Sequence, residues 1–243
     1  MPFAEQPGLT TDPQDEPFDV LAEDGSLTGR VLPRGQVHRL GLWHPAFHLW
    51  IVADDGDRLS VLLQRRSWTK DTMPGKVDVS VGGHFRAGEY TPSVPPADRA
   101  RRAVLRELRE ELGLEAELDA VHWLGRRWSV GTGPGVIDRE IQDLFVWPVA
   151  RVPGGLVPDR REVSAVYAVS SRDLRLLLAG EQDETGVSVL WQAEEDAGST
   201  ADSLARLRLD DLIPGRRGYW LAMLTMLERW LQGETIEPLI LRA

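Results

Sequence analysis

The stretch Arg106-Glu107-Leu108-Arg109-Glu110-Glu111-Leu112-Gly113-Leu114 places three glutamates at positions i, i+3 and i+4. On a helix this spacing brings Glu107, Glu110 and Glu111 onto one face, about one turn apart. Like charges at this distance destabilise an isolated helix by roughly 0.2–0.5 kcal/mol per pair. A hard divalent cation such as Mg²⁺, which takes oxygen ligands, offsets that cost. The stretch therefore predicts a helix whose acidic face binds a metal ion.

The neighbouring sequence supports a helix here. Val104, Leu108 and Leu112 form an apolar stripe, helical signals run from Pro96 to Leu112, and Gly113 is a helix stop. The alternative is a solvated face of mixed charge, because four arginines lie close by: Arg101, Arg102, Arg106 and Arg109. An expected strand that runs into Gly82-Gly83 favours the metal site, since its backbone oxygens can meet the carboxylates.

Composition limits the function. The 243 residues are 42% apolar, and the absence of cysteine excludes disulfides, thiolate zinc sites and a cysteine nucleophile. The formal charge of −10 argues against a nucleic-acid partner. No apolar run approaches the roughly 20 residues of a membrane span, and the N-terminus lacks the order of a signal peptide. We therefore expect a cytoplasmic protein with no membrane partner.

The pattern of apolar residues predicts one domain. Residues 1–16 resemble a flexible tail, and residues 17–243 a single domain with an insertion or long loop near 181–202. A helix near 215–232 has one apolar face. Its Trp220 and Trp230 either cap the domain or support a dimer, so a monomer and a homodimer both stay open. Strands are expected at 18–21, 47–52, 59–64, 77–81, 121–128, 140–149 and 163–169, with a further helix at 171–178. Strands and helices in this mixed order indicate an α/β or α+β sandwich.

The acidic stretch and the loop before it carry a resemblance. Gly83-x5-Glu89, followed by Arg106-Glu107-Leu108-x-Glu110-Glu111-x-Gly113-Leu114, resembles the signature box of the Nudix hydrolases. The resemblance implies an α/β/α sandwich around a mixed sheet and hydrolysis of a diphosphate linked to another moiety. It also implies Mg²⁺ or Mn²⁺ held by Glu107, Glu110 and Glu111, one of which serves as the base for water. The Gly83 carbonyl is then a further ligand.

One departure concerns the spacing. Residues 90–105 separate Glu89 from Arg106, which is longer than the family usually has. The extra residues include three prolines and predict a longer loop before the helix. Asp98 would take the place of Glu89 if the insertion came first. Arg106 is expected to pair with a carboxylate and to hold the loop in place.

A second resemblance covers residues 18–170 and points to the isopentenyl-diphosphate isomerase-like branch of the same superfamily. The matching segments are Val37-His38, Trp43-His44-Pro45-Ala46-Phe47, Gln64-Arg65-Arg66-Ser67, Lys70 with Pro74-Gly75, and Val81-Gly82-Gly83-His84. In the isomerases the positions matching Arg66 and Lys70 hold the substrate diphosphate. The positions that surround a metal match His38, His44, His84, Asp138 and Glu140.

Two differences favour hydrolysis over isomerisation. The isomerases have a catalytic cysteine where this chain has Gly82, and they tend to lose part of the acidic box that is complete here. Moving protons on an alkene needs a positioned acid and base, whereas hydrolysing a diphosphate needs clustered carboxylates and metal. We therefore predict a metal-dependent hydrolase acting on a nucleoside diphosphate derivative or another organic diphosphate. The alternatives are an isomerase-type enzyme and a catalytically inactive module that binds a diphosphate ligand.

Several residues keep two interpretations. Glu140 is either an exposed acid on an edge strand or a ligand or base near the metal. The three histidines either form a metal set or line the pocket, and Arg66 either contacts phosphate or belongs to a surface pair. The loop at 90–98 and the segment at 181–202 are the expected determinants of substrate choice.

Overall fold

The computed structural model describes residues 12–56, 58–70, 72–133, 136–193 and 205–242. In the first half of the chain the elements are β1 (Pro17–Leu21), β2 (Leu27–Pro33), α1 (Arg34–Leu40), β3 (Trp43–Asp54), β4 (Leu59–Arg66), β5 (Val77–Asp78), β6 (Val81–His84) and α2 (Asp98–Leu112). They are followed by the short 3-10 turn η1 (Leu118–Ala120), β7 (His122–Gly133), β8 (Val136–Val149), β9 (Val163–Ser170), α3 (Ser171–Ala179), β10 (Glu184–Gln192), β11 (Ala205–Arg208), the turn η2 (Leu209–Asp211), α4 (Arg217–Leu231) and β12 (Leu239–Leu241).

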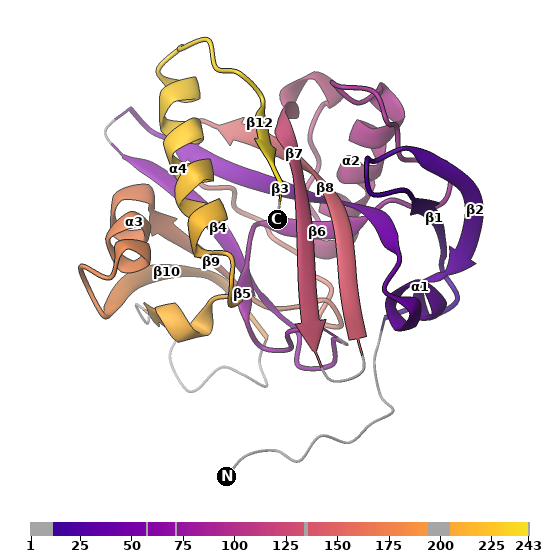
Figure 1. Cartoon of the computed structure of the whole chain (residues 1–243). Coiled ribbons are helices and arrows are strands. Elements are labelled where there is room, and N and C mark those ends of the chain that lie inside the picture. Colours follow the sequence, from indigo (N-terminus) through magenta and orange to yellow (C-terminus); the bar gives the residue numbers. More distant parts are fainter. Residues whose placement is uncertain (1–11, 57, 71, 134–135, 194–204, 243) are drawn as a thin grey trace.

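A large mixed sheet forms the centre of the molecule (Figure 1). Its strands lie in the order β11-β10-β9-β4-β3-β8-β7-β12, with β5 beside β4 and β6 beside β3. β3 runs parallel to β8, and β12 runs parallel to β7, while the other pairs are antiparallel. The β1–β2 hairpin is a separate small sheet.

Helices cover both faces of the sheet, which confirms the expected sandwich. On one face Val104, Leu108 and Leu112 of α2 join a buried cluster with Phe47 and Leu49 of β3. This is the apolar stripe that the sequence predicts. Because it packs on the sheet, the adjacent glutamates of α2 are held at the edge of the core.

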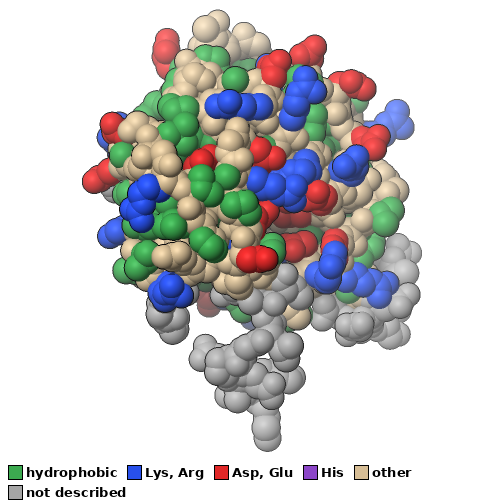
Figure 2. Space-filling model, turned by 90° about the vertical axis from the view of Figure 1, so that its right-hand side faces the viewer, with side chains coloured by type: hydrophobic (Ala, Val, Ile, Leu, Met, Phe, Trp, Pro, Cys, Tyr) green, Lys and Arg blue, Asp and Glu red, His purple; other side chains and the backbone are tan. Residues whose placement is uncertain are grey.

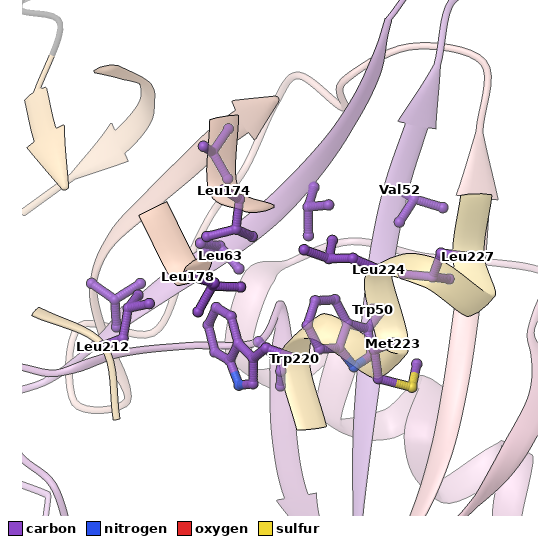
Figure 3. Close-up of a cluster of buried hydrophobic side chains, with 14 of the residues drawn as sticks. Trp50, Val52, Leu63, Leu174, Leu178, Leu212, Trp220, Met223, Leu224 and Leu227 are labelled. Atoms are coloured by element: carbon purple, nitrogen blue, oxygen red, sulfur yellow. The ribbon is translucent and has the colours of Figure 1, made fainter. Parts of the chain in front are cut away.

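The other face is covered by α3 and α4. Figure 3 shows this cluster, in which Trp220 and Leu224 of α4 meet Trp50 of β3 and Leu178 of α3. The Trp50 and Trp220 rings meet edge to face at 5.4 Å. The expected C-terminal helix therefore exists, and its Trp220 caps the sandwich.

One expected strand is divided in two. Val77 and Val79 lie in the α4 cluster, whereas Val81 lies in the α2 cluster, so they do not share one face as a single strand would require. The change falls at Ser80, whose hydroxyl accepts a hydrogen bond from the Ile51 amide at 2.7 Å and donates one to the Leu62 carbonyl at 2.6 Å. Ser80 thus links β3 and β4 at the point where β5 ends and β6 begins.

Two further expectations need correction. The segment at 181–202, expected as an insertion or long loop, contains β10, which pairs with β9 and extends the central sheet; residues 194–202 lie outside the described part. Residues 12–16, assigned to the tail, lie against the domain: the Glu16 carbonyl accepts a hydrogen bond from the Arg34 amide at 2.8 Å. Residues 1–11 are outside the described part.

Candidate functional site

The guanidinium of Arg106 organises the acidic face of α2. Its nitrogens lie 2.5 Å from Glu107 Oε1, 3.1 Å from Glu110 Oε2 and 3.0 Å from Glu89 Oε2. Charge-assisted hydrogen bonds of this kind are stronger than neutral ones. Arg106 therefore joins the helix to the loop that precedes it, as expected from the sequence.

The contacts also distinguish the two candidate loop carboxylates. Glu89 accepts hydrogen bonds from Arg106 and from the Arg86 amide at 2.8 Å. Asp98 instead pairs with Arg101 on the surface of the first helical turn. The helix begins at Asp98, so the extra residues form a loop between Glu89 and the helix. Glu89, rather than Asp98, is therefore the loop carboxylate that contacts Arg106.

Gly83 lies directly against the acidic helix. It pairs with Phe47 in the sheet, and a Cβ at Gly83 would come within 2.8 Å of Phe47 Cζ and 3.1 Å of Glu107 Cγ. Only a glycine lets the strand approach this closely without displacing its neighbours. The backbone of β6 and the Glu107 side chain are therefore adjacent, as a shared metal site requires.

Glu107 and Glu111 are unusual because they are carboxyl groups removed from water. Burial is the main reason that the pKa of Glu107 is raised to about 7 and that the pKa of Glu111 is raised well above its ordinary value. The charge of Glu107 adds to the effect on Glu111, whereas a hydrogen bond from Gln64 Nε2 at 3.0 Å opposes it. The buried Glu111 carboxylate and the half-buried Glu107 carboxylate, which lies against the backbone of Gly83, supply oxygen ligands of the kind that a hard divalent cation takes.

Glu110 lies at the outer side of this group. Its side chain is 45% exposed, and its carboxylate lies 3.6 Å from Arg86 as well as 3.1 Å from Arg106. Figure 2 shows the face of the molecule on this side, where acidic and basic side chains gather near the middle of the view. The three box glutamates therefore differ: Glu111 is buried, Glu107 is half-buried and Glu110 faces solvent.

The expected histidine set is brought together at a second position. His38 of α1, His44 of β3 and His84 of β6 have ring centroids 5.0–5.9 Å apart, and Phe18 stacks on two of the rings. Asp138 and Glu140 of β8 complete the group. We call these five residues, His38, His44, His84, Asp138 and Glu140, the histidine cluster.

The histidine cluster contains two sets of donor atoms that lie within 4.8 Å of one another: His38, His44 and His84, and His44, Asp138 and Glu140. His84 Nε2 lies 3.0 Å from Glu140 Oε1, and His44 Nε2 lies 3.4 Å from Asp138 Oδ1. His38 Nε2 is 3.9 Å from the same Asp138 oxygen, too far for a hydrogen bond. The Nδ1 atom of His44 lies 3.0 Å from the Leu42 carbonyl, which orients the ring with Nε2 toward the carboxylates. The cluster thus fits a transition metal ion, which imidazole and carboxylate ligands bind well.

Burial keeps His38 and His44 neutral, the form that binds metal. Desolvation is the largest cause that lowers the pKa of His38 to about 2 and that of His44 to about 4, and the nearby His84 lowers both further. Glu140 behaves in the opposite way. Burial would raise its pKa, but the hydrogen bond and charge of His84 outweigh burial and hold the pKa well below its ordinary value.

The expected phosphate contacts have other partners in this structure. The Arg66 guanidinium donates to the carbonyl and the hydroxyl of Thr72, each at 3.0 Å. The Lys70 ammonium lies 2.5 Å from both Asp12 and Glu162. Lys70 nevertheless borders the acidic helix, because its charge acts on the pKa of Glu111.

Gly82 faces away from the acidic helix, toward the side covered by α4. A Cβ there would meet His48, Asp78 and Val79 at 3.7–3.9 Å, which is ordinary contact. Arg216, which precedes α4, reaches this region and pairs with Asp78 Oδ1 at 2.7 Å. Tyr219 of α4 accepts a hydrogen bond from the Trp50 indole at 3.0 Å and lies 2.8 Å from His48 Nδ1. The side chains next to Gly82 are therefore buried polar groups that are hydrogen-bonded to one another.

Sequence reasoning missed four residues of these sites: Asp12, Arg34, Gln64 and Arg216. Gln64 had a signal, because it follows the buried Leu62 by two positions and so shares the face that meets α2. The other three reach the sites from segments far away in the chain, and no local pattern marks them.

Comparisons with known proteins identify the family of this chain. The NUDIX domain family matches residues 42–190, and the chain belongs to this family. It is 29% identical over 217 residues to an uncharacterized Nudix hydrolase of Clostridium acetobutylicum, covering 88% of this chain and 98% of that protein. It is 32% identical over 149 residues to an isopentenyl-diphosphate Delta-isomerase of Paenarthrobacter aurescens, covering 60% and 71%. A solved structure, the Nudix hydrolase RenU from M. smegmatis, is 18% identical with a TM-score of 0.46, covering 90% of this chain and 98% of that one.

Nudix hydrolases generally use divalent metals. Among the described residues, the sets of three or more whose donor atoms lie within 4.8 Å of one another belong to the histidine cluster, and the three box glutamates do not form such a set. Within the described residues, no helix is long and apolar enough to span a membrane.

Proposed function

We propose that this protein is a metal-dependent hydrolase that cleaves the diphosphate linkage of a nucleoside diphosphate derivative or another organic diphosphate. The observation that carries the proposal is the pair of carboxyl groups Glu107 and Glu111, of which Glu111 is buried and Glu107, half-buried, lies against Gly83. Burial raises the pKa of both groups, so their charged forms are costly in this environment. A cation of the kind that Nudix hydrolases use reduces that cost.

In this proposal Glu107, Glu110, Glu111 and the Gly83 carbonyl hold Mg²⁺ or Mn²⁺. The ion neutralises phosphate oxygens and lowers the pKa of water. Arg106 keeps Glu107 and Glu110 in place through its charged hydrogen bonds. One of the glutamates accepts the proton of the attacking water. Arg66 and Lys70, on the loop beside the acidic helix, contact the substrate phosphates.

The histidine cluster supports a second element of the proposal. His38, His44, His84 and Asp138 hold a transition metal ion together with Glu140, which also serves as ligand or base. This arrangement keeps an isomerase-type activity as the second candidate function, because the resemblance to the isomerases includes these positions. Gly82 opposes it, since neither this residue nor any other in the chain supplies a thiol.

A screen for hydrolysis products, separated by chromatography, tests the proposal, because cleavage of a nucleotide sugar or a dinucleotide yields two phosphomonoesters and no free phosphate. The purified protein is assayed with Mg²⁺ or Mn²⁺ on nucleotide sugars, nucleoside di- and triphosphates, dinucleotides and prenyl diphosphates. We expect hydrolysis of at least one class, with a kcat that falls at least about 100-fold in Glu111→Gln. The matched control is Glu115→Gln, an exposed glutamate just after the helix, which should retain full activity. Interconversion of isoprenyl diphosphate isomers without hydrolysis of any diphosphate would refute the proposal.

A further inference from the structure

Asp12 is an acidic residue that lies inside a basic part of the site. Its side chain is only 2% exposed. Its Oδ1 atom lies 2.5 Å from Lys70 Nζ and 3.6 Å from Arg34 Nη2. The carboxylate of Asp12 is buried between two cations and therefore occupies the position that a bound anion from outside the protein would take.

The backbone around Asp12 is fixed across the edge of the site. The Gln14 carbonyl accepts a hydrogen bond from the Gly35 amide at 3.0 Å, and the Glu16 carbonyl accepts one from the Arg34 amide at 2.8 Å. The Glu16 carboxylate pairs with Arg86 at 2.9 Å, and Arg86 also approaches Glu110. Residues 12–16, which we call the strap, therefore lie across α1 and the loop after β6.

The two cations that Asp12 contacts border both metal-binding groups. Burial alone would lower the pKa of Lys70, but the carboxylates of Asp12 and Glu162 outweigh burial and raise it, so the ammonium stays charged. Lys70 acts electrostatically on Glu111. Arg34 Nη1 lies 3.3 Å from His84 Nδ1, at the edge of the histidine cluster. An anion bound at this point is thus adjacent to the proposed metals.

We propose that the Asp12 carboxylate is an internal ligand of a subsite for a substrate phosphate, formed by Lys70 and Arg34, and that a phosphate binds there by displacing it. The inference rests on the proposed function, because that function requires a phosphate next to the acidic helix. A phosphate group presents more negative charge and more acceptor oxygens than a carboxylate, so it makes stronger bonds to the same two cations. Asp12 therefore lowers the apparent affinity for the substrate without taking part in the reaction.

The test compares Asp12→Asn with Asp15→Asn. Both substitutions remove one negative charge from the strap, but Asp15 is exposed. The dissociation constant for inorganic pyrophosphate is measured by calorimetry, and KM and kcat are measured for the best substrate. We expect Asp12→Asn to lower KM and the pyrophosphate constant by roughly 3- to 10-fold, with kcat within about twofold of the parent protein. Asp15→Asn should change none of these values.

Lys70→Met provides a second measurement. If Asp12 and the phosphate compete for Lys70, the gain from Asp12→Asn disappears in the double variant. Thermal unfolding identifies a variant that does not fold, and Asp12→Ser then replaces it. Pyrophosphate affinity that is unchanged or weaker in the folded Asp12 variant would overturn the inference, as would an equal gain in Asp15→Asn. If no diphosphate is hydrolysed, yet Asp12→Asn still tightens pyrophosphate binding, the proposed function fails and this inference stands.

Discussion

Glu89 and Arg106 are 17 positions apart in the chain, yet the Glu89 carboxylate accepts a hydrogen bond from Arg106 Nη2 at 3.0 Å. The contact closes the long loop before α2 and connects it to the acidic face of the helix. Arg106 also contacts Glu107 and Glu110, so one guanidinium reduces the repulsion among three carboxylates.

Removal of Arg106 should therefore destabilise the protein, because Glu89, Glu107 and Glu110 lose a positively charged hydrogen-bond donor. We expect Arg106→Ala to lower the free energy of unfolding by about 1–2 kcal/mol, because hydrogen-bonded charged groups lose their partner. Addition of Mg²⁺ should recover part of the loss, since a cation can replace the missing charge. Denaturant unfolding with and without Mg²⁺ measures both effects. Arg109→Ala, an exposed arginine on the same helix, should stay within about 0.5 kcal/mol of the parent protein; an equal loss in both variants would contradict this account.

The contribution of Glu107 to the stability of the metal-free protein should fall as pH rises. The pKa of Glu107 is about 7 in the folded protein, above its ordinary value of 4.5. A carboxyl group of this kind contributes stability that is complete below pH 4.5 and is lost as pH rises through 7. The loss is on the order of 3 kcal/mol for Glu107, and Mg²⁺ should oppose it more strongly at pH 8 than at pH 5.

Melting temperatures at pH 5 and pH 8, in chelator and in Mg²⁺, measure this dependence. Glu107→Gln is the informative control, because an amide does not titrate, so the difference between the two melting profiles in chelator isolates the contribution of Glu107. If that difference were the same at pH 5 and pH 8, the carboxyl group would not be protonated as described.

The two adjacent glycines should respond differently to alanine. Gly83→Ala places a Cβ 2.8 Å from Phe47 and 3.1 Å from Glu107, whereas Gly82→Ala makes only ordinary contacts at 3.7 Å or more. We expect Gly83→Ala to cost about 1–3 kcal/mol of stability through overpacking, with a weakened Mg²⁺ dependence of hydrolysis. Gly82→Ala should fold and hydrolyse normally. Unfolding and Mg²⁺ titration of activity measure both effects. If Gly83→Ala and Gly82→Ala changed stability and Mg²⁺ dependence equally, Gly83 would not belong to the metal site.

The histidine cluster should bind metal independently of the acidic helix. In a Glu111→Gln background, where the acidic site is impaired, we expect residual Mn²⁺ binding that is detectable by electron paramagnetic resonance. Adding His38→Gln should weaken that binding at least about 10-fold. His122→Gln is the matched control, because this histidine is exposed and lies against Trp230 rather than in the cluster. Unchanged Mn²⁺ binding in the His38 variant would leave the cluster without a metal role.

The sequence alone determined the acidic helix and the faces of most strands. The glutamate spacing, the apolar stripe and the stop at Gly113 are local features, since each depends on residues a few positions apart. The terminal helix and a sandwich of mixed strands and helices followed from the same periodicity, whereas the α/β/α arrangement was implied by the resemblance to the Nudix hydrolases. The strand at Glu184–Gln192 was missed because its burial alternates weakly and its neighbours are acidic.

Only the tertiary structure decided which distant residues meet. It selected Glu89 over Asp98 as the partner of Arg106, and it gathered three histidines from α1, β3 and β6. It also placed Asp12 on Lys70, 58 positions later in the chain. Such contacts depend on strand register and on how helices and loops lie against the sheet, which no local pattern of residues specifies.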